Sequence, residues 1–365
     1  TYYPTELSDR DATFLITRGD LRIYGGYASG GLNRNTFINP TILSGDIGTI
    51  GTNTDNSYHV LVVSGITSDE DSLVIDGFSI VWGNANTSGS KDYNQQSIPK
   101  NSAGGLVLWN NSNGDKIKIK NCIVSANYAS DAGGGIYNYK TSATYLNCLV
   151  TGNVANYGAG FANVSNSHVK IVNNTIASNR AGNTGGAMRN SNSNPEIVNT
   201  LAYYNSNGIS NNSSSPSFKY SLIQDRYIDI DGNVNATFNP QIIAPANFLF
   251  APIITGDFKL QDISPIINKG DNIAYKSAGG SLFNDLDIES KSRVFDFNQD
   301  GIIDIGAYEI NVDLSEEIIG TIRYVKEGAT GNGTSWTNAS GDLQAMINVS
   351  SKKDQIWVAT GSYYP

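Results

Sequence analysis

Short segments in which apolar and polar residues alternate run through most of the chain, and turns rich in Asn, Gly and Ser separate them. Residues 116–120, with the sequence Lys-Ile-Lys-Ile-Lys, are a clear example. Alternation with a period of two is the pattern of a β-strand that buries one face. The chain therefore predicts an all-β protein built from many short strands, with no helix in its repeating part.

An asparagine recurs every 26 residues in the middle of the chain, at Asn127, Asn153, Asn179 and Asn205. Asn84 joins this series 43 residues upstream of Asn127 if residues 85–102 form an inserted loop. Amide side chains at equivalent turns can hydrogen-bond to the turns above and below them. We therefore expect these five residues to form a structural ladder; a polar groove that binds a ligand is the alternative.

A repeat of about 26 residues with two or three short strands is typical of one coil of a right-handed parallel β-helix. Equivalent side chains of successive coils then stack. A second recurring marker, an apolar residue just after an Asn-containing corner, places Ile123, Leu149, Ile176 and Leu201 in one apolar ladder inside the coil. Cys122 and Cys148 also occupy equivalent positions, which predicts stacked, buried thiols; a disulfide or a reactive pair is the alternative.

The repeat sets the expected domain boundaries. The β-helix body covers residues 1–310, with regular coils at about 76–225 and irregular C-terminal coils at 226–310. Residues 311–322 are the expected linker. Residues 323–365 contain a candidate helix with Leu343, Met346 and Ile347 on one face, followed by a strand at 355–359. A small segment of this kind can cover the open edge of a β-helix, so it is interpreted as a cap.

The two ends of the chain repeat each other. Tyr363-Tyr364-Pro365 matches Tyr2-Tyr3-Pro4 at an offset of 361 residues. We interpret residues 323–365 as the N-terminal cap and first strand of the next module in a tandem array. The expected partners are neighbouring copies of the same module, either in one covalent array or in a non-covalent homopolymer.

Several motifs give the chain a family resemblance. They are Tyr324-Val325, Gly333-Thr334-Ser335-Trp336, Ile356-Trp357-Val358-Ala359-Thr360-Gly361, Gly25-Gly26-Tyr27, Leu43-Ser44-Gly45-Asp46, Asp55-Asn56-Ser57-Tyr58-His59-Val60, Gly133-Gly134-Gly135-Ile136-Tyr137-Asn138, Ser264-Pro265-Ile266-Ile267 and Asp304-Ile305-Gly306-Ala307-Tyr308-Glu309. Over essentially its whole length the sequence resembles the pectin-lyase-like β-helix modules of large secreted proteins of Bacteroidota-type bacteria. The resemblance implies an extracellular, cell-surface location and an adhesin-like role, with export and sorting signals outside this sequence.

Composition narrows the classes of partner. Only 16% of the residues are charged, the net charge is −9, and the isoelectric point is near 4.7. Such a chain has no basic surface for a phosphate backbone, and it has no apolar run long enough to cross a membrane. We therefore expect neither nucleic-acid binding nor direct membrane insertion.

Enzymes that cleave polysaccharides share this fold, but a fold alone does not give a function. Outward positions of the regular coils are mostly Asn, Ser, Thr and Tyr, and the only histidines are His59 and His168. No catalytic constellation is visible, so we expect no enzyme, and we expect His59 to make a structural hydrogen bond. A polysaccharide-binding or polysaccharide-degrading protein remains the alternative to a structural module of a surface stalk, fibre or adhesin. Surface glycans or other cells are candidate targets of such an adhesin.

Two segments are candidates for ligand binding. The insertion carries Lys91, Asp92, Tyr93 and Lys100, which could contact a ligand or a neighbouring module. The sequence from Asp296 to Asp304 matches the first nine positions of an EF-hand-type loop, which predicts a Ca²⁺ site. Its candidate ligands are Asp296, Asn298, Asp300, the backbone carbonyl of Ile302, and Asp304. The twelfth position is Ala307 instead of Glu, and a hairpin turn is the alternative.

Overall fold

The computed structural model describes residues 1–67, 72–111, 116–226, 230–294, 301–310, 321–350 and 354–363. It divides into two compact units, unit 1 (Thr1–Asn311) and unit 2 (Val312–Pro365). Each unit is described by itself.

Unit 1 is a stack of parallel coils that form three seven-stranded sheets and a fourth, four-stranded sheet. Sheet I contains β1 (Phe14–Ile16), β4 (Leu61–Ser64), β10 (Leu106–Trp109), β14 (Ile136–Tyr139), β18 (Phe161–Val164), β22 (Met188–Ser191) and β25 (Ile209–Asn212). Sheet II contains β2 (Leu21–Tyr24), β5 (Leu73–Asp76), β11 (Ile117–Lys120), β15 (Ser142–Leu146), β19 (His168–Val172), β23 (Glu196–Val198) and β26 (Ser217–Lys219). Sheet III contains β3 (Thr41–Ser44), β6 (Phe78–Val81), β12 (Ile123–Ser125), β16 (Leu149–Thr151), β20 (Thr175–Ala177), β24 (Leu201–Tyr203) and β27 (Leu222–Ile223). Sheet IV contains β7 (Asn84–Ala85), β13 (Tyr128–Ala129), β17 (Val154–Tyr157) and β21 (Arg180–Thr184).

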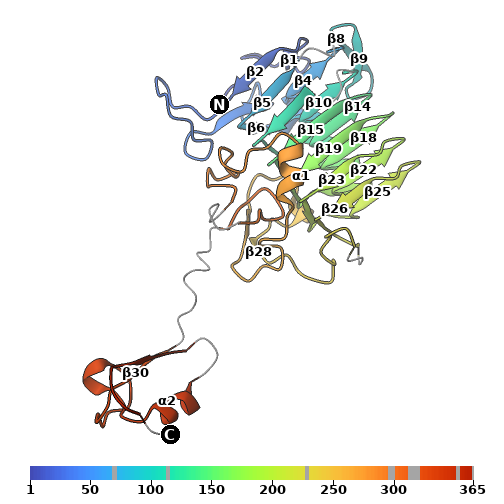
Figure 1. The fold of residues 1–365 in the computed structure, drawn as a ribbon. Helices are drawn as coiled ribbons and strands as arrows, with labels where there is room; N and C mark the ends of the chain where they lie inside the picture. Colours follow the sequence, from blue (N-terminus) through green and yellow to red (C-terminus); the bar gives the residue numbers. More distant parts are fainter. Residues whose placement is uncertain are drawn as a thin grey trace. The chain divides into compact units, whose positions relative to one another are not determined.

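Each coil visits the sheets in the same order, I, II, III and, in the middle coils, IV, before the chain returns to sheet I. In Figure 1 the colour accordingly passes from blue to yellow along the stack. Neighbouring strands pair in parallel and in register, as in Ile136↔Phe161 and Tyr145↔Ile171. This architecture confirms the predicted parallel β-helix.

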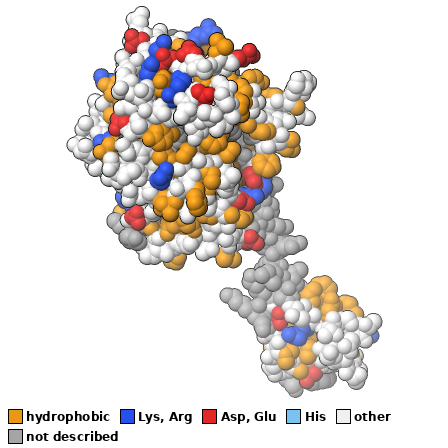
Figure 2. Space-filling view, turned by 180° about the vertical axis from the view of Figure 1, so that it is seen from behind, with side chains coloured by type: hydrophobic (Ala, Val, Ile, Leu, Met, Phe, Trp, Pro, Cys, Tyr) orange, Lys and Arg blue, Asp and Glu red, His pale blue; other side chains and the backbone are white. Residues whose placement is uncertain are grey.

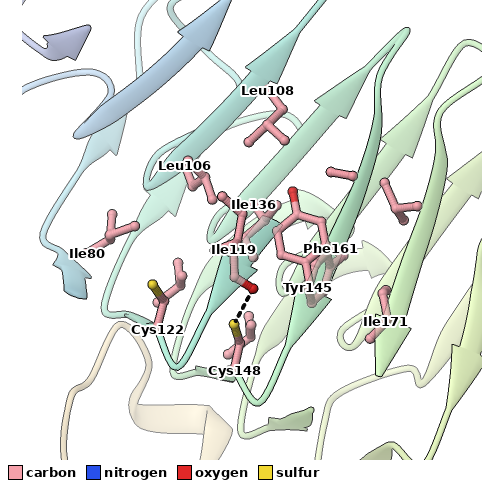
Figure 3. Close-up of a cluster of buried hydrophobic side chains, with 14 of the residues drawn as sticks. Ile80, Leu106, Leu108, Ile119, Cys122, Ile136, Tyr145, Cys148, Phe161 and Ile171 are labelled. Carbon is pink, nitrogen blue, oxygen red and sulfur yellow. Dashed lines mark hydrogen bonds between the residues drawn. The ribbon is translucent and has the colours of Figure 1, made fainter. Parts of the chain in front are cut away.

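The core lies inside the coils. Leu106, Ile136, Phe161 and Met188 stack along sheet I, and side chains of sheets II and III face them. Figure 3 shows several of these side chains together with both cysteines. Cys122 and Cys148 are free and buried, which confirms the predicted thiols, and the Cys148 thiol donates to the Ile119 carbonyl at 3.4 Å.

The apolar ladder predicted at residues 123, 149, 176 and 201 is wrong in register. Ile123 pairs with Leu149, Leu149 with Thr175, and Thr175 with Leu201. The ladder that faces the core is Val124, Val150, Ile176 and Ala202. Side chains alternate between the two faces of a strand, so a shift of one residue exchanges inside for outside.

The outer face of sheet III is nevertheless buried, because the C-terminal part of unit 1 covers it. Leu149, Leu201 and Leu222 pack against Phe258, Ile266 and Ile305. Leu146 and Val172, the last residues of strands β15 and β19 in sheet II, pack similarly against Tyr275 and Ile303. The covering segment contains the antiparallel pair β28 (Ile242–Ala244) and β29 (Asp257–Leu260), the short helix α1 (Asn272–Ser277) and the 3-10 turn η3 (Phe248–Phe250). Val234 still pairs in parallel with Leu222 and so continues sheet III for one more coil. The described residues of 242–310 fold back along the stack, where the sequence predicts that irregular coils continue it.

Two smaller elements interrupt the coils near the N-terminal end. The 3-10 turn η1 (Asn53–Asp55) lies between β3 and β4. The antiparallel hairpin β8 (Ser90–Tyr93) and β9 (Gln96–Pro99) lies within the predicted insertion.

Unit 2 is a small α/β unit. Its strands β30 (Ile322–Val325) and β31 (Gln355–Val358) pair in parallel, and η5 (Trp336–Asn338) and α2 (Leu343–Val349) lie between them in the chain. Helix α2 begins at the N-cap Asp342, whose side chain accepts a hydrogen bond from the Ala345 amide. Val325, Ala339 and Met346 are its buried apolar side chains among the described residues. The helix and strand predicted for this segment are both present.

Candidate functional site

Asparagines at one corner of the coil form the predicted ladder over four coils. The Oδ1 of Asn153 accepts from the amide and the Nδ2 of Asn127, at 3.1 and 3.0 Å. Asn153 bonds in the same way to Asn179, and Asn179 to Asn205. The Nδ2 of Asn153 also donates to the Val124 carbonyl at 2.9 Å. These side chains are buried and use their polar atoms on the backbone and on each other, so this part of the ladder offers no groove for a ligand.

Asn84 does not belong to this ladder, contrary to the prediction. Tyr128 pairs with Asn84, so Gly83 occupies the position equivalent to Asn127 and donates its amide to the Asn127 Oδ1 at 2.9 Å. A Cβ at Gly83 would collide with the carbonyl oxygen of Gly104, so no side chain fits there. The Asn84 side chain instead donates to the Asn53 carbonyl at 2.5 Å.

A polar cleft of about 440 Å³ lies beside this end of the ladder. Its lining is mostly amide and aromatic: Asn53, Asn56, Trp82, Gly83, Asn84, Asn86, Ala126, Tyr128 and Pro252. The Arg10 guanidinium is committed to the backbone carbonyls of Asn56 and Asn84, at 2.7 and 2.8 Å, and to the Asn86 side chain. Its lining residues include no carboxylate, imidazole or thiol, and Tyr128 is the one titratable side chain among them, so the cleft offers mainly hydrogen bonds.

The predicted contact loop folds against the body as the β8–β9 hairpin. Lys100 and Lys91 form ion pairs with Asp11 at 2.7 and 3.7 Å, and the Tyr93 hydroxyl donates to the Asp11 carbonyl at 2.8 Å. Tyr93 is buried, whereas Asp92 is exposed and does not join this cluster. Three of the four predicted residues therefore hold the hairpin in place, and a role in ligand or module contact stays a prediction.

His59 lies beneath this hairpin and is fully buried. Its Nδ1 donates to the Ala103 carbonyl at 2.7 Å, and its ring meets Tyr93 edge-on at 5.9 Å. Burial lowers the pKa of His59 to about 4, so the imidazole is neutral at pH 7. This geometry fits the structural hydrogen bond expected from the sequence.

The calcium prediction falls largely outside the described residues, because Asp296, Asn298 and Asp300 are not among them. Ile302 is exposed. Asp304 is fully buried, and its two carboxylate oxygens accept from the amides of Asn268 and Ile310, at 2.6 and 2.8 Å. The described residues contain no group of three or more His, Cys, Asp or Glu side chains that could hold a metal ion. The Ca²⁺ site stays a prediction.

Asp304 belongs to a cluster of buried charges that the sequence did not predict, together with Asp287, Arg293 and Glu309. The Arg293 guanidinium lies 3.5 Å from the Glu309 carboxylate, and Asp287 accepts from the Glu309 amide at 2.9 Å. Burial raises the pKa of Asp304 to about 6 and raises the pKa values of Asp287 and Glu309 as well. Asp287 also lines a cleft of about 240 Å³ together with Arg34 and Asp76. Arg293, Asp304 and Glu309 are buried away from that cleft, so we assign them to the packing of the covering segment.

The outer face of sheet I carries a row of stacked aromatic side chains, of which Trp109 and Tyr139 are partly exposed and Tyr137 is buried. Trp109 stacks on Tyr139 at 4.1 Å and on Tyr137 at 6.0 Å, with interplanar angles of 19° and 16°. Lys140 lies 5.3 Å from the Tyr139 ring centre, and Arg189 lies 4.5 Å from that of Tyr157. Flat rings flanked by cations and polar groups can bind the apolar face of a sugar ring. We call Trp109, Tyr137 and Tyr139 the aromatic row.

In the part of the chain that the structure describes, the core is accessible at the N-terminal end of the coil stack, which we call the open end. An apolar recess of about 230 Å³ reaches the core there, with a lining of Phe14, Leu15, Ile16, Ile23, Leu43, Leu61, Ile75 and Phe78. Phe14, Ile16 and Ile23 are only partly buried, although their counterparts in the next coil, Leu61, Val63 and Ile75, are buried. Neither the recess nor the aromatic row was predicted as a site. The sequence pattern assigns apolar and aromatic residues to the core. Whether such a residue lies instead at the end of the stack or on an outer face depends on the strand register, which the pattern does not give.

On the face of unit 1 that Figure 2 shows, charged side chains gather near the top and are sparse elsewhere. Among the described residues, no helix has the length and apolar character needed to cross a membrane. Comparison of the chain with family models, with curated proteins and with solved structures finds no match.

Proposed function

We propose that the chain is a structural and adhesive module of a long extracellular β-helix array, of the kind that forms a stalk, fibre or adhesin on a bacterial surface. The observation that carries the proposal is the in-register stack. Seven strands in each of three sheets, spaced about 4.8 Å apart, give a rod about 30 Å long. Side-chain ladders reinforce the backbone pairing along this axis, which suits a load-bearing element.

Two further observations support an array. The chain repeats Tyr-Tyr-Pro at positions 2–4 and 363–365, and among the described residues an apolar recess reaches the core at the N-terminal end of the stack. An exposed sheet edge above an open core favours association with further strands. The pectin-lyase-like resemblance adds the extracellular, cell-surface location, with other modules, surface glycans or other cells as partners.

Electron microscopy of the natural polypeptide, together with its intact mass, tests this proposal. We expect fibres with a regular axial repeat and a chain mass many times 39.1 kDa. Compact single particles with the mass of one module would contradict it.

Polysaccharide binding is the second candidate function, and the aromatic row is the observation that favours it. Stacking of sugar rings on Trp109 and Tyr139 predicts retardation of the protein in gels that contain an acidic or neutral polysaccharide. Trp109→Ala should abolish the retardation, whereas Tyr27→Ala, which removes an exposed tyrosine elsewhere, should preserve it. Equal mobility with and without each polysaccharide would reject this candidate.

A further inference from the structure

The open end of unit 1 presents both a sheet edge and an apolar surface. Strand β2 is the terminal strand of sheet II, and in the described part of the chain its outer edge has no strand partner. Leu21 and Ile23 point from β2 toward the core, because they pair with the buried Leu73 and Ile75. A strand added outside β2 would therefore bring its inward side chains over the recess.

Unit 2 offers a surface of matching chemistry. Ile347 on α2 and Val358 on β31 are apolar, yet they are 47 and 43% exposed. Strand β31 pairs with β30 on one edge, and its other edge has no partner within the described residues. A unit of this size gains stability when such a surface is covered.

The repeated tripeptide indicates where β31 fits. Tyr2 pairs in parallel with Leu43, so it forms the next position of sheet III outside β3. Tyr363, its match in the sequence, follows β31 by five residues, and each coil passes from sheet II to sheet III in that order. Strand β31 thus corresponds to a sheet II position one coil outside β2.

We propose that unit 2 of one copy of the chain covers the open N-terminal end of unit 1 of a second copy, with β31 pairing in parallel with β2. Sheet II then continues through β31 and β30, and α2 lies across the end of the core. This inference rests on the proposed array function and names the joint between its modules. Tyr2 already occupies the sheet III edge, so between separate copies the joint uses the edge of sheet II.

The faces of β31 set the register. Arg323 of β30 bonds to Ser350 and to the Val349 carbonyl at the end of α2, and Arg323 pairs with Ile356. Ile356 and Val358 therefore share the face toward the helix. That face covers the recess when Ile356 lies beside Leu21 and Val358 beside Ile23, which places Gln355 beside Asp20.

Cysteine crosslinking of the full chain tests this register. Neighbouring parallel strands bring Cα atoms to about 4.8 Å, within the range of a disulfide. A mixture of the Asp20→Cys and Gln355→Cys chains should give a crosslinked dimer under mild oxidation. Ser217→Cys, at the opposite edge of sheet II, is the matched control and should give none with Gln355→Cys. The buried native thiols should not interfere.

The double variant Asp20→Cys/Gln355→Cys shows which chain supplies the unit 2 that covers the N-terminal end of unit 1. A series of crosslinked dimers and longer oligomers supports the proposal. Crosslinked material with the mass of a single chain would show that unit 2 covers its own unit 1 and would overturn it. Equal crosslinking by the Ser217→Cys control would show non-specific contact and would also overturn it.

Sedimentation of the uncrosslinked chain gives an independent measurement. We expect concentration-dependent association that Val358→Asp weakens at least tenfold, because it places a charge over the apolar recess. Ile263→Asp, which changes an exposed residue of the covering segment, should associate as the unchanged chain does. Association that is absent at all concentrations, or unaffected by Val358→Asp, would reject the joint.

These results separate the joint from the array. Fibres of the natural polypeptide without association or crosslinking of single chains would leave the array standing and reject this joint. A natural polypeptide of one module's mass would reject the array, whatever the crosslinking shows.

Discussion

At the scale of single residues, asparagine side chains inside unit 1 form ladders in which their amide groups satisfy one another. Asn138, Asn163 and Asn190 form a second, buried ladder inside the coil that ends at the exposed Asn211, with Nδ2 to Oδ1 distances of 2.8 to 2.9 Å. The Tyr145 hydroxyl donates to the Asn138 Oδ1 at 2.6 Å. Because a buried amide without partners is costly, each ladder is stable only when its neighbours are present.

Removal of one member of the corner ladder should therefore cost more than a single hydrogen bond. Asn153→Ala leaves the Asn127 amide and the Asn179 Oδ1 without one partner each, so we expect a loss of about 2–4 kcal/mol in the free energy of unfolding. Asn156→Ala, an exposed asparagine of the same coil, should cost less than about 1 kcal/mol. Urea denaturation measures both, and equal losses would contradict a structural ladder.

The two thiols should be inert in the folded protein. Burial raises the pKa of Cys122 to about 12 and also raises that of Cys148, so neither forms the reactive thiolate at pH 8. We expect no alkylation by iodoacetamide within hours in buffer and complete alkylation of both in urea, as read by mass spectrometry. Rapid modification of the folded chain would contradict the packing in Figure 3.

At the scale of elements, the strands of sheet III separate two apolar layers. Val150 faces the interior of the coils, whereas Leu149 faces the covering segment. The same strand therefore holds the coil together with one side chain and attaches the C-terminal segment with the next.

A charge at each position should have a different consequence. Leu149→Asp should release the covering segment, so hydrogen exchange at residues 242–310 rises while the coils stay protected. Val150→Asp should destabilise the whole of unit 1, because it places an unpaired charge in the core. Exchange measured by mass spectrometry distinguishes the two, and identical exchange maps would contradict the two-layer arrangement.

The buried charges make the covering segment sensitive to pH. Asp304 has a pKa of about 6 in the folded protein and an ordinary value of 3.8, so the folded state binds the proton more tightly. The contribution of Asp304 to the free energy of unfolding is therefore largest below about pH 4. It falls by about 3 kcal/mol in total as the pH rises through about 6. Asp287 and Glu309 shift in the same direction.

Amide hydrogen exchange in the covering segment should therefore be slower at pH 5 than at pH 7, once the rates are corrected for the pH dependence of intrinsic exchange. Asp304→Asn should reduce this dependence, because the amide does not ionise, and Asp287 and Glu309 should account for the part that is left. A segment more stable at pH 7 than at pH 5 would contradict the assignment.

At the scale of the whole molecule, the chain contains two units with separate cores. Among its described residues unit 2 buries the apolar side chains of Val325, Ala339 and Met346, whereas unit 1 has a continuous core along its coils. Small cores give marginal stability.

Two unfolding transitions are therefore expected at low protein concentration. Val325→Ala should lower the melting temperature of the smaller transition, with a cost of about 1–3 kcal/mol, and leave the larger one unchanged. Differential scanning calorimetry resolves them. A single transition that Val325→Ala shifts as a whole would contradict two independent units.

Periodicity in the sequence predicted the coil, the Asn ladder at residues 127–205, the two buried thiols, and the helix and strand of unit 2. Each of these features depends on local alternation or on a spacing of 26 residues, and both patterns can be recognised directly in the sequence. The amide ladder follows from the same spacing, because stacked coils bring equivalent residues together.

The tertiary structure alone decided which face of a strand is inside, which residue lies opposite which, and what covers the coils. Ile123 and Val124 are both apolar, so alternation could not assign the inward one in a strand buried on both faces. Gly83, and not Asn84, occupies the ladder position, because the hairpin insertion changes the spacing from which the register was predicted. The side chains of Asp287, Arg293, Asp304 and Glu309 come together only when the covering segment folds. These features depend on contacts between segments far apart in the chain, and no local pattern records them.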